Sequence, residues 1–140
     1  MAAEPQPRAA QGPAFAGRSG LSRRSVLKGE PVTVPGPHDS VMAGLNCGTP
    51  SALAWPHIRD AFDVFVAIED ELARAGMRRL AELGLDRGEC AGGVVAAAQA
   101  ALPQIRTHDG AVVLLLTEGV TDPVHFEQVV GRAAETGRSG

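Results

Sequence analysis

The chain has 140 residues, of which 44% are hydrophobic, so it is long enough and apolar enough to fold as one domain with a core. Its net charge is −3 and only 4% of its residues are aromatic, which argues against a nucleic-acid partner and against a base-stacking surface. Two cysteines without CxxC spacing are typical of reduced thiols in a cytoplasmic protein. No apolar run approaches the ~20 residues of a membrane-spanning helix, so no membrane partner is expected.

Residues 1–20 are rich in Ala, Pro and Gly and show no periodicity, which predicts a disordered lead-in. The stretch SRRSVLK, Ser22 to Lys28, resembles a twin-arginine export motif, but the residues that follow it are polar and broken by proline. We therefore interpret this stretch as a short helix that ends at Gly29 and not as an export signal. The alternative, an exported α/β protein of unrelated function, is correspondingly disfavoured. Lys28 is the single lysine of the chain.

A regular pattern begins at Ala54. Residues 55–62 predict a short helix with Pro56 in its first turn, and residues 64–68 predict a buried strand. The next predicted helix begins at Asp70 and stops at Gly84. Its apolar face is expected to consist of Leu72, Ala75, Met77, Leu80 and Leu83.

The rest of the chain continues this alternation. The expected elements are a turn over 87–93, a small-residue helix over 94–102, a second buried strand over 111–116, a loop over 117–123, a helix over 124–135 and a frayed tail over 136–140. Strands that alternate with helices predict an α/β fold, with a partial parallel sheet and flanking helices. Because two strands cannot form a stable sheet covered on both faces, the chain looks incomplete as an independent domain.

A candidate binding site follows the second predicted strand, because ligands of α/β sheets bind beyond the carboxyl ends of the strands. Thr117 would place a hydroxyl there, and Gly119 would let the backbone approach a ligand. The alternative is an ordinary strand-to-helix turn in which Thr121 or Asp122 caps the next helix. The residues themselves leave both interpretations open.

The run GECAGG, residues 88–93, precedes a predicted helix, whose free N–H groups favour an anion. It lacks the spacing of a P-loop or of a dinucleotide fingerprint. Cys47 and Cys90 are more typical of small thiols than of nucleophiles, and the four histidines show no metal-ligand spacing. No catalytic residue and no metal site is therefore predicted within this chain.

Three stretches together resemble a known family. They are PVTVPGPHDSVMAGLNCGTPSALAWPHIRD, LGLDRGECAGG and VVLLLTEGVTDP, which begin at Pro31, Leu83 and Val112. They are similar, in this order, to the C-terminal part of diaminopropionate ammonia-lyases, which are pyridoxal-phosphate enzymes of fold type II. The resemblance runs from about Ser25 to about Gly131 and implies the C-terminal portion of a tryptophan synthase β-like fold over residues 21–135. It also implies a lyase that converts 2,3-diaminopropionate to pyruvate and ammonia, with threonine and serine as secondary substrates.

The resemblance implies pyridoxal 5′-phosphate as cofactor and assigns residues to its site. Thr117 matches the hydroxyl residue that contacts the pyridine nitrogen, and a neutral hydroxyl does not enforce a protonated ring. The loop from Met42 to Cys47 would lie near the ring, and Glu89 near the same pocket. The cofactor-binding residues implied within that loop are Gly44, Leu45 and Asn46.

The resemblance also places the lysine that holds the cofactor, the glycine-rich phosphate loop and the acid/base carboxylates in the family's N-terminal part. Lys28 does not match that lysine. We therefore expect a C-terminal fragment that is inactive alone and that acts on a small amino acid. Its expected partner is a second copy or a complementing N-terminal half. The alternative is a non-catalytic binding or regulatory module derived from the same fold.

Overall fold

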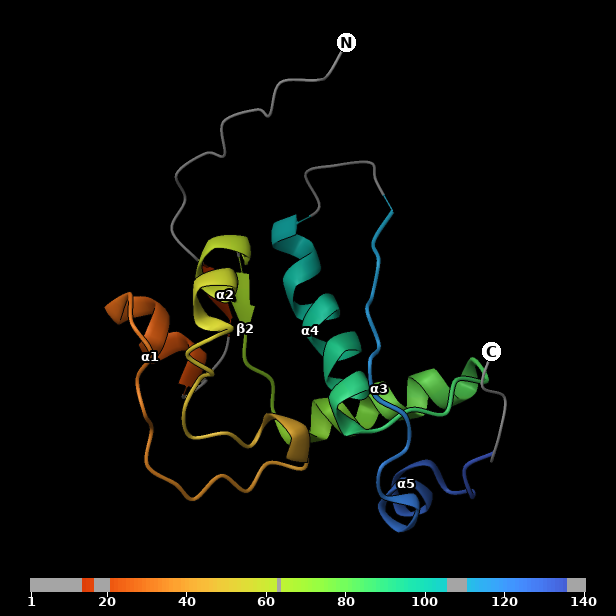
Figure 1. The fold of residues 1–140 in the computed structure, drawn as a ribbon. Helices are drawn as coiled ribbons and strands as arrows, with labels where there is room; N and C mark the ends of the chain where they lie inside the picture. Colours follow the sequence, from red (N-terminus) through yellow and green to blue (C-terminus); the bar gives the residue numbers. More distant parts are fainter. Residues whose placement is uncertain (1–13, 17–20, 63, 106–110, 136–140) are drawn as a thin grey trace.

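The structure is a computed structural model that describes residues 14–16, 21–62, 64–105 and 111–135 (Figure 1). The elements in chain order are β1 (Ala14–Ala16), α1 (Leu21–Lys28), the 3-10 turn η1 (Ala43–Leu45), α2 (Trp55–Ala61), β2 (Val64–Val66), α3 (Asp70–Glu82), α4 (Glu89–Ile105) and α5 (Pro123–Val130). The predicted tail and most of the predicted lead-in lie outside the described residues. None of the helices in the described ranges is long and apolar enough to cross a membrane.

Several helix boundaries follow from single residues, as predicted. Helix α1 ends before Gly29, and α3 stops just before Gly84, both of which have a φ of +73°. Glycine is favoured at these positions because other residues rarely adopt a left-handed conformation. Pro56 lies in the first turn of α2, where its missing N–H costs nothing. Asp70 opens α3 at its positive dipole end.

The core lies where α3 crosses α4. The buried residues of α3 are Ala73, Gly76, Met77 and Leu80, which have the spacing of one helical face. The predicted face was right at Met77 and Leu80 but wrong at its other three residues, because Leu72 and Leu83 are 49% and 60% exposed and Ala75 is exposed as well. A Cβ on Gly76 would overlap the backbone of Gly92. The small residues therefore decide which face of α3 is buried, since they let α4 approach closely.

Helix α4 begins at Glu89, so the predicted turn over 87–93 is wrong for most of its length. Glycine disfavours a helix by about 1 kcal/mol, which is why this run suggests a turn. Here Gly92 faces α3, and a Cβ on it would overlap the carbonyl of Ala73 and crowd Met77. Packing against α3 thus requires glycine in this position and overrides its low helix propensity.

The last helix is shorter than predicted. Helix α5 ends at Val130, where Gly131 adopts a φ of +84°, instead of continuing to Glu135. The segment after it is held by Asp86, whose carboxylate accepts hydrogen bonds from both terminal nitrogens of Arg132 at 2.7 and 2.9 Å. Asp86 is only 10% exposed, and its pKa lies below the ordinary value because Arg132 bonds to the ionised form. This pair fixes the end of α5 against the connection that leads into α4.

The predicted sheet of residues 64–68 and 111–116 is not confirmed. Strand β2 covers Val64–Val66 rather than 64–68, and it pairs in parallel with β1, so that Phe15 lies opposite Phe65. Residues 111–116 do not form a strand. In Figure 1 they are drawn in blue as an extended trace without a strand arrow, and Leu116 at their end packs against Leu80, Ala91 and Val95. A sheet that joins 64–68 to 111–116 therefore stays a prediction.

Candidate functional site

Three segments meet around the first turn of α4: the loop 40–47, the start of α4 itself and the segment 117–120. The N–H of Gly88 donates to the carbonyl of Gly119 at 3.0 Å. The N–H of Cys90 donates to Oε1 of Glu118 at 3.3 Å. A Cβ on Gly88 would overlap the Glu118 carboxylate, so glycine is required where this side chain crosses the helix start.

Glu118 occupies the place that the sequence suggested for an anion. A helix N-terminus carries partial positive charge and stabilises a carboxylate. Here that carboxylate comes from the chain's own Glu118, which bonds to the Cys90 N–H. The run GECAGG is therefore used for close packing and for binding an internal carboxylate, rather than for cradling a phosphate.

The loop 40–47 lies along the same helical turn. A Cβ added to Gly44 would be 3.3 Å from Sγ of Cys90 and 3.6 Å from Oε2 of Glu118. Farther along α4, Gly93 makes room for the thioether of the buried Met42. The loop can approach α4 this closely because side chains are missing on both sides of the contact.

Hydrogen bonds to Asp70 fix the start of this loop. The Asp70 carboxylate accepts from the Ser40 hydroxyl at 2.6 Å and from the Val41 N–H at 3.1 Å. Asn46 Nδ2 then donates to the Ser40 carbonyl at 2.6 Å, which closes the loop on itself. The two hydrogen bonds to Asp70 are partly buried and tie the loop to the first residue of α3.

The thiol of Cys90 lies between Gly44 and Glu118. Its pKa is raised to about 11, mainly by burial and then by the hydrogen bond and negative charge of Glu118. A hydrogen bond with the backbone of Gly44 acts in the opposite direction but is a smaller effect. Because the thiolate is the nucleophilic form, this thiol is suited to packing and not to nucleophilic catalysis at neutral pH.

Glu89 points to the opposite side of the helix start, toward α5. It is 5% exposed, and its Oε1 lies 2.7 Å from Nδ1 of His125. The N–H of His125 donates to the carboxylate of Asp122 at 3.0 Å, so Asp122 caps α5. The capping role that the sequence left open for Asp122 is thus confirmed, and the partly buried pair of Glu89 and His125 joins α5 to α4.

Thr117 and Leu45 are exposed. Leu45 is 64% exposed in η1, and Thr117 follows Leu116, which packs against the core residues Leu80, Ala91 and Val95. Within the described part of the chain, the Thr117 hydroxyl has no hydrogen-bond partner. It is thus available to bond to a molecule at the edge of this site, whereas the Asn46 amide is engaged with Ser40.

Sequence reasoning missed the residues that connect these segments. Glu118 stands next to the predicted Thr117, but its contact with Cys90 joins residues 28 positions apart. The contact of Glu89 with His125 spans 36 positions, and that of Ser40 with Asp70 spans 30. The one available signal was the position of Glu118 inside the stretch TEGVTDP.

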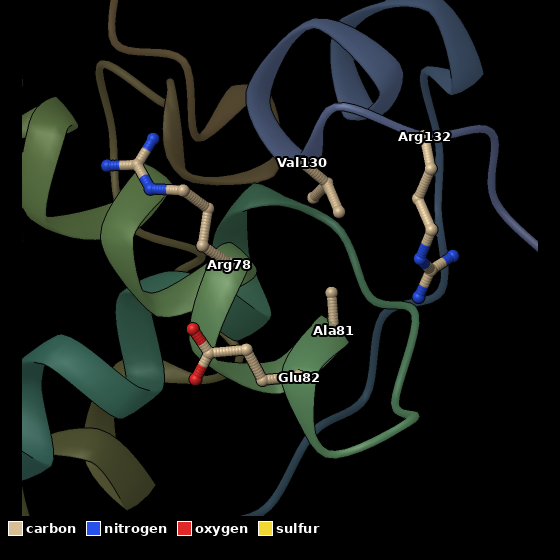
Figure 2. A pocket seen from close by; sticks show the side chains of 5 residues that line it. All are labelled: Arg78, Ala81, Glu82, Val130 and Arg132. Atoms are coloured by element: carbon tan, nitrogen blue, oxygen red, sulfur yellow. The ribbon is translucent and has the colours of Figure 1, made fainter.

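A separate hollow of about 270 Å³ lies between α3 and the end of α5 (Figure 2). It is lined by Arg78, Ala81, Glu82, Val130 and Arg132. Both guanidinium groups are already paired, Arg78 with Glu71 and Arg132 with Asp86. None of the residues around the start of α4 lines this hollow, and no group of three metal-ligating side chains occurs in the described ranges.

The stretches that build the site are also those shared with known proteins. The pyridoxal-phosphate dependent enzyme family matches residues 9–118, which includes the loop 40–47, the start of α4 and Thr117. The chain belongs to this family. The family's cofactor is pyridoxal phosphate, and its fold is of the tryptophan synthase β type.

Curated relatives agree with this assignment. The chain is 34% identical over 122 residues to the diaminopropionate ammonia-lyase of Escherichia coli strain K12, and 33% identical over 124 residues to that of Salmonella typhimurium strain LT2. Each match covers 76% of this chain. The chain spans only 31% of the length of these relatives.

The start of α4 does not fit the phosphate of the cofactor. Glu118 already occupies the helix N-terminus with a negative charge, which would repel a phosphate. The Thr117 hydroxyl is exposed and has no hydrogen-bond partner among the described residues, so it is available to a ligand. The phosphate-binding groups are therefore expected elsewhere in the fold.

Proposed function

We propose that this chain forms the C-terminal, cofactor-side part of a pyridoxal-phosphate-dependent ammonia-lyase that converts 2,3-diaminopropionate to pyruvate and ammonia. The observation that carries this proposal is the meeting of three family-matched segments at one place, the first turn of α4. The substrate follows from the printed activity of the relatives, diaminopropionate ammonia-lyase.

In this proposal Thr117 orients the cofactor ring. Its hydroxyl has no partner among the described residues and can bond to the pyridine nitrogen without carrying a charge. When bound, pyridoxal phosphate supplies an electron sink for bond cleavage next to the substrate's amino group. A neutral partner at the ring nitrogen leaves that nitrogen unprotonated and so moderates the sink.

The loop around Gly44 and Asn46 closes the same side of the site. Its backbone is fixed by Asp70 and by the Asn46 amide, so it can hold a ring without reordering when the ring binds. Leu45 is 64% exposed and would place an apolar side chain against the ring. Glu89 acts from behind the site, where its pairing with His125 holds α5 and the start of α4 together.

We further propose that these 140 residues are inactive by themselves and that the active enzyme is cytoplasmic. Lys28 is the single lysine and ends α1, upstream of the family-like loop. It does not match the lysine to which the family's cofactor is attached. Borohydride reduction of the chain with pyridoxal phosphate should therefore leave Lys28 unmodified by mass spectrometry, and a stoichiometric pyridoxyl adduct on Lys28 would contradict this.

A chimera tests the lyase proposal. The segment of the Escherichia coli enzyme that aligns with this chain is replaced by the corresponding residues of this chain, and pyruvate formation from 2,3-diaminopropionate is measured. We expect the chimera to bind pyridoxal phosphate and to turn over the substrate. The matched controls are the unaltered Escherichia coli enzyme and a chimera carrying Gly44→Val. The variant should lose turnover because its Cβ would lie only 3.3 Å from Sγ of Cys90, and its two methyl groups need further space beside Cys90 and Glu118.

The outcomes separate the two candidate functions. A folded chimera that forms pyruvate supports the lyase. A folded chimera that binds the cofactor but forms no pyruvate would contradict it and favour the non-catalytic module.

A further inference from the structure

The segment 111–116, AVVLLL, is the largest run of exposed apolar side chains in the described part of the chain. Val112, Val113 and Leu115 are 58%, 86% and 76% exposed. Monomeric proteins rarely expose a contiguous apolar surface of this kind unless it binds a partner. We call residues 111–116 the apolar segment.

Exposure along the apolar segment alternates with the period of a strand. Val113 and Leu115 are the most exposed, whereas Leu114 is 39% exposed and Leu116 packs against the core residues Leu80, Ala91 and Val95. Successive side chains of an extended backbone point to opposite faces. One face is therefore already partly covered by the helices, and the face that carries Val113 and Leu115 is bare.

The backbone of the apolar segment is equally unpartnered. Among the described residues, no backbone hydrogen bond involves the N–H or carbonyl groups from Ala111 to Thr117. The first backbone–backbone hydrogen bond after the segment is made by the Gly119 carbonyl, which accepts from the N–H of Gly88. An extended backbone with free donors and acceptors is a template for pairing with another strand.

The family assignment indicates what covers this surface. The family match runs to residue 118 and so includes the apolar segment, but the chain covers only 31% of a relative's length. Parallel strands of an α/β fold need neighbours on both edges and helices on both faces. The short β1–β2 ladder does not extend to the apolar segment. The two thirds of a relative that lie outside the match are large enough to supply the missing strands and the second helical layer.

We propose that the apolar segment is the docking edge for the portion of a pyridoxal-phosphate-dependent fold that this chain does not match. Strands of that portion pair with the free backbone from Ala111 to Thr117, and its apolar side chains cover Val113 and Leu115. The identity of the partner rests on the proposed function. The docking surface itself rests on the exposure and the unpaired backbone.

Co-expression tests this docking. The full chain is tagged and produced together with the Escherichia coli diaminopropionate ammonia-lyase from which the aligned segment has been deleted, and the purified material is examined by size-exclusion chromatography with light scattering. We expect a one-to-one complex. Amide hydrogen exchange should be slower at residues 112–116 in the complex than in the chain alone, because paired amides exchange slowly.

Matched lysine pairs locate the contact. The variant Val113→Lys/Leu115→Lys should lower recovery of the complex at least about tenfold, since it places two charges on the docking face. The control Leu27→Lys/Leu53→Lys changes the charge equally at side chains that are 63% and 85% exposed elsewhere, and it should leave recovery unchanged.

Three results would overturn the docking proposal. They are the absence of a complex with the unaltered chain, equal recovery with both lysine pairs, and self-association of the chain that only the Val113/Leu115 pair abolishes. The last would assign the surface to a second copy. A complex without lyase activity would contradict the proposed function alone, whereas an active chimera without a complex would contradict the docking alone.

Discussion

Cys90 and Glu118 illustrate how single residues set the chemistry of this site. Glu118 binds the N-terminus of α4 and, at the same time, places a negative charge next to the Cys90 thiol. The pKa of that thiol is raised to about 11, first by burial and then by Glu118. A cysteine at a helix N-terminus usually has a lowered pKa, so here burial and the carboxylate outweigh the helix dipole.

This balance predicts that the Cys90 thiol reacts slowly with alkylating reagents. Relative to an ordinary value of 9.0, a pKa of about 11 lowers the thiolate fraction at neutral pH about a hundredfold. The exposed Cys47 should therefore be alkylated by iodoacetamide well before Cys90, as followed by mass spectrometry. Alkylation of Cys90 should keep rising, by about tenfold per pH unit, until the pH approaches 11, because the reactive form is the deprotonated one.

The variant Glu118→Gln is the control for the charge. It removes the negative charge, so the pKa of Cys90 should fall and its alkylation at a fixed pH should become faster. Burial remains in the variant, so the rate should not reach that of Cys47. Equal labelling of Cys47 and Cys90 in the unaltered chain would contradict the packing at this site.

At the scale of elements, the crossing of α3 and α4 organises the molecule. Gly76 and Gly92 approach each other so closely that neither tolerates a Cβ without a shift of backbone. The crossing in turn fixes the first turn of α4, around which the loop 40–47 and Glu118 are arranged. Small residues at this crossing thus help to position the site, although they are not part of it.

The variant Gly92→Ala should destabilise the chain. Alanine is favoured in a helix by about 1 kcal/mol, but overpacking against the fixed carbonyl of Ala73 costs about 1–3 kcal/mol or more. We expect a lower urea midpoint with an unchanged m-value. The control Gly119→Ala should change stability by less than about 0.5 kcal/mol, because nothing lies within 4 Å of its added Cβ. An unchanged midpoint for Gly92→Ala would contradict the close crossing.

Helix boundaries that depend on a single residue were predicted correctly from the sequence. Boundaries and contacts that depend on packing between distant segments were not. Gly29, Asp70 and Gly84 mark helix ends through their own conformation or charge, so these boundaries were predicted correctly. The start of α4 was missed because its glycines are explained only by the packing of α3 against Gly92. The contact of Glu89 with His125 was missed for the same reason, since no local pattern joins residues 36 positions apart.

At the scale of the whole molecule, one part of the described chain is well packed, and another part exposes apolar side chains and an unpaired backbone. The α3–α4 core and the loop 40–47 are packed, whereas the segment 111–116 has an uncovered face and a free backbone. The chain covers 31% of the length of its relatives, and the site that we propose would likewise hold only one side of a cofactor. Thr117 lies at the boundary, directly after the apolar segment and beside Glu118.

The protonation state of the cofactor's ring nitrogen tests the central claim, that Thr117 faces this nitrogen. The chimera is loaded with pyridoxal phosphate that carries ¹⁵N in the ring, and the ¹⁵N chemical shift is measured. With Thr117 we expect an unprotonated nitrogen, and with Thr117→Asp a protonated one, because a carboxylate stabilises the ring's positive charge. A ¹⁵N shift that is the same with threonine and with aspartate would contradict the placement of this chain against the cofactor.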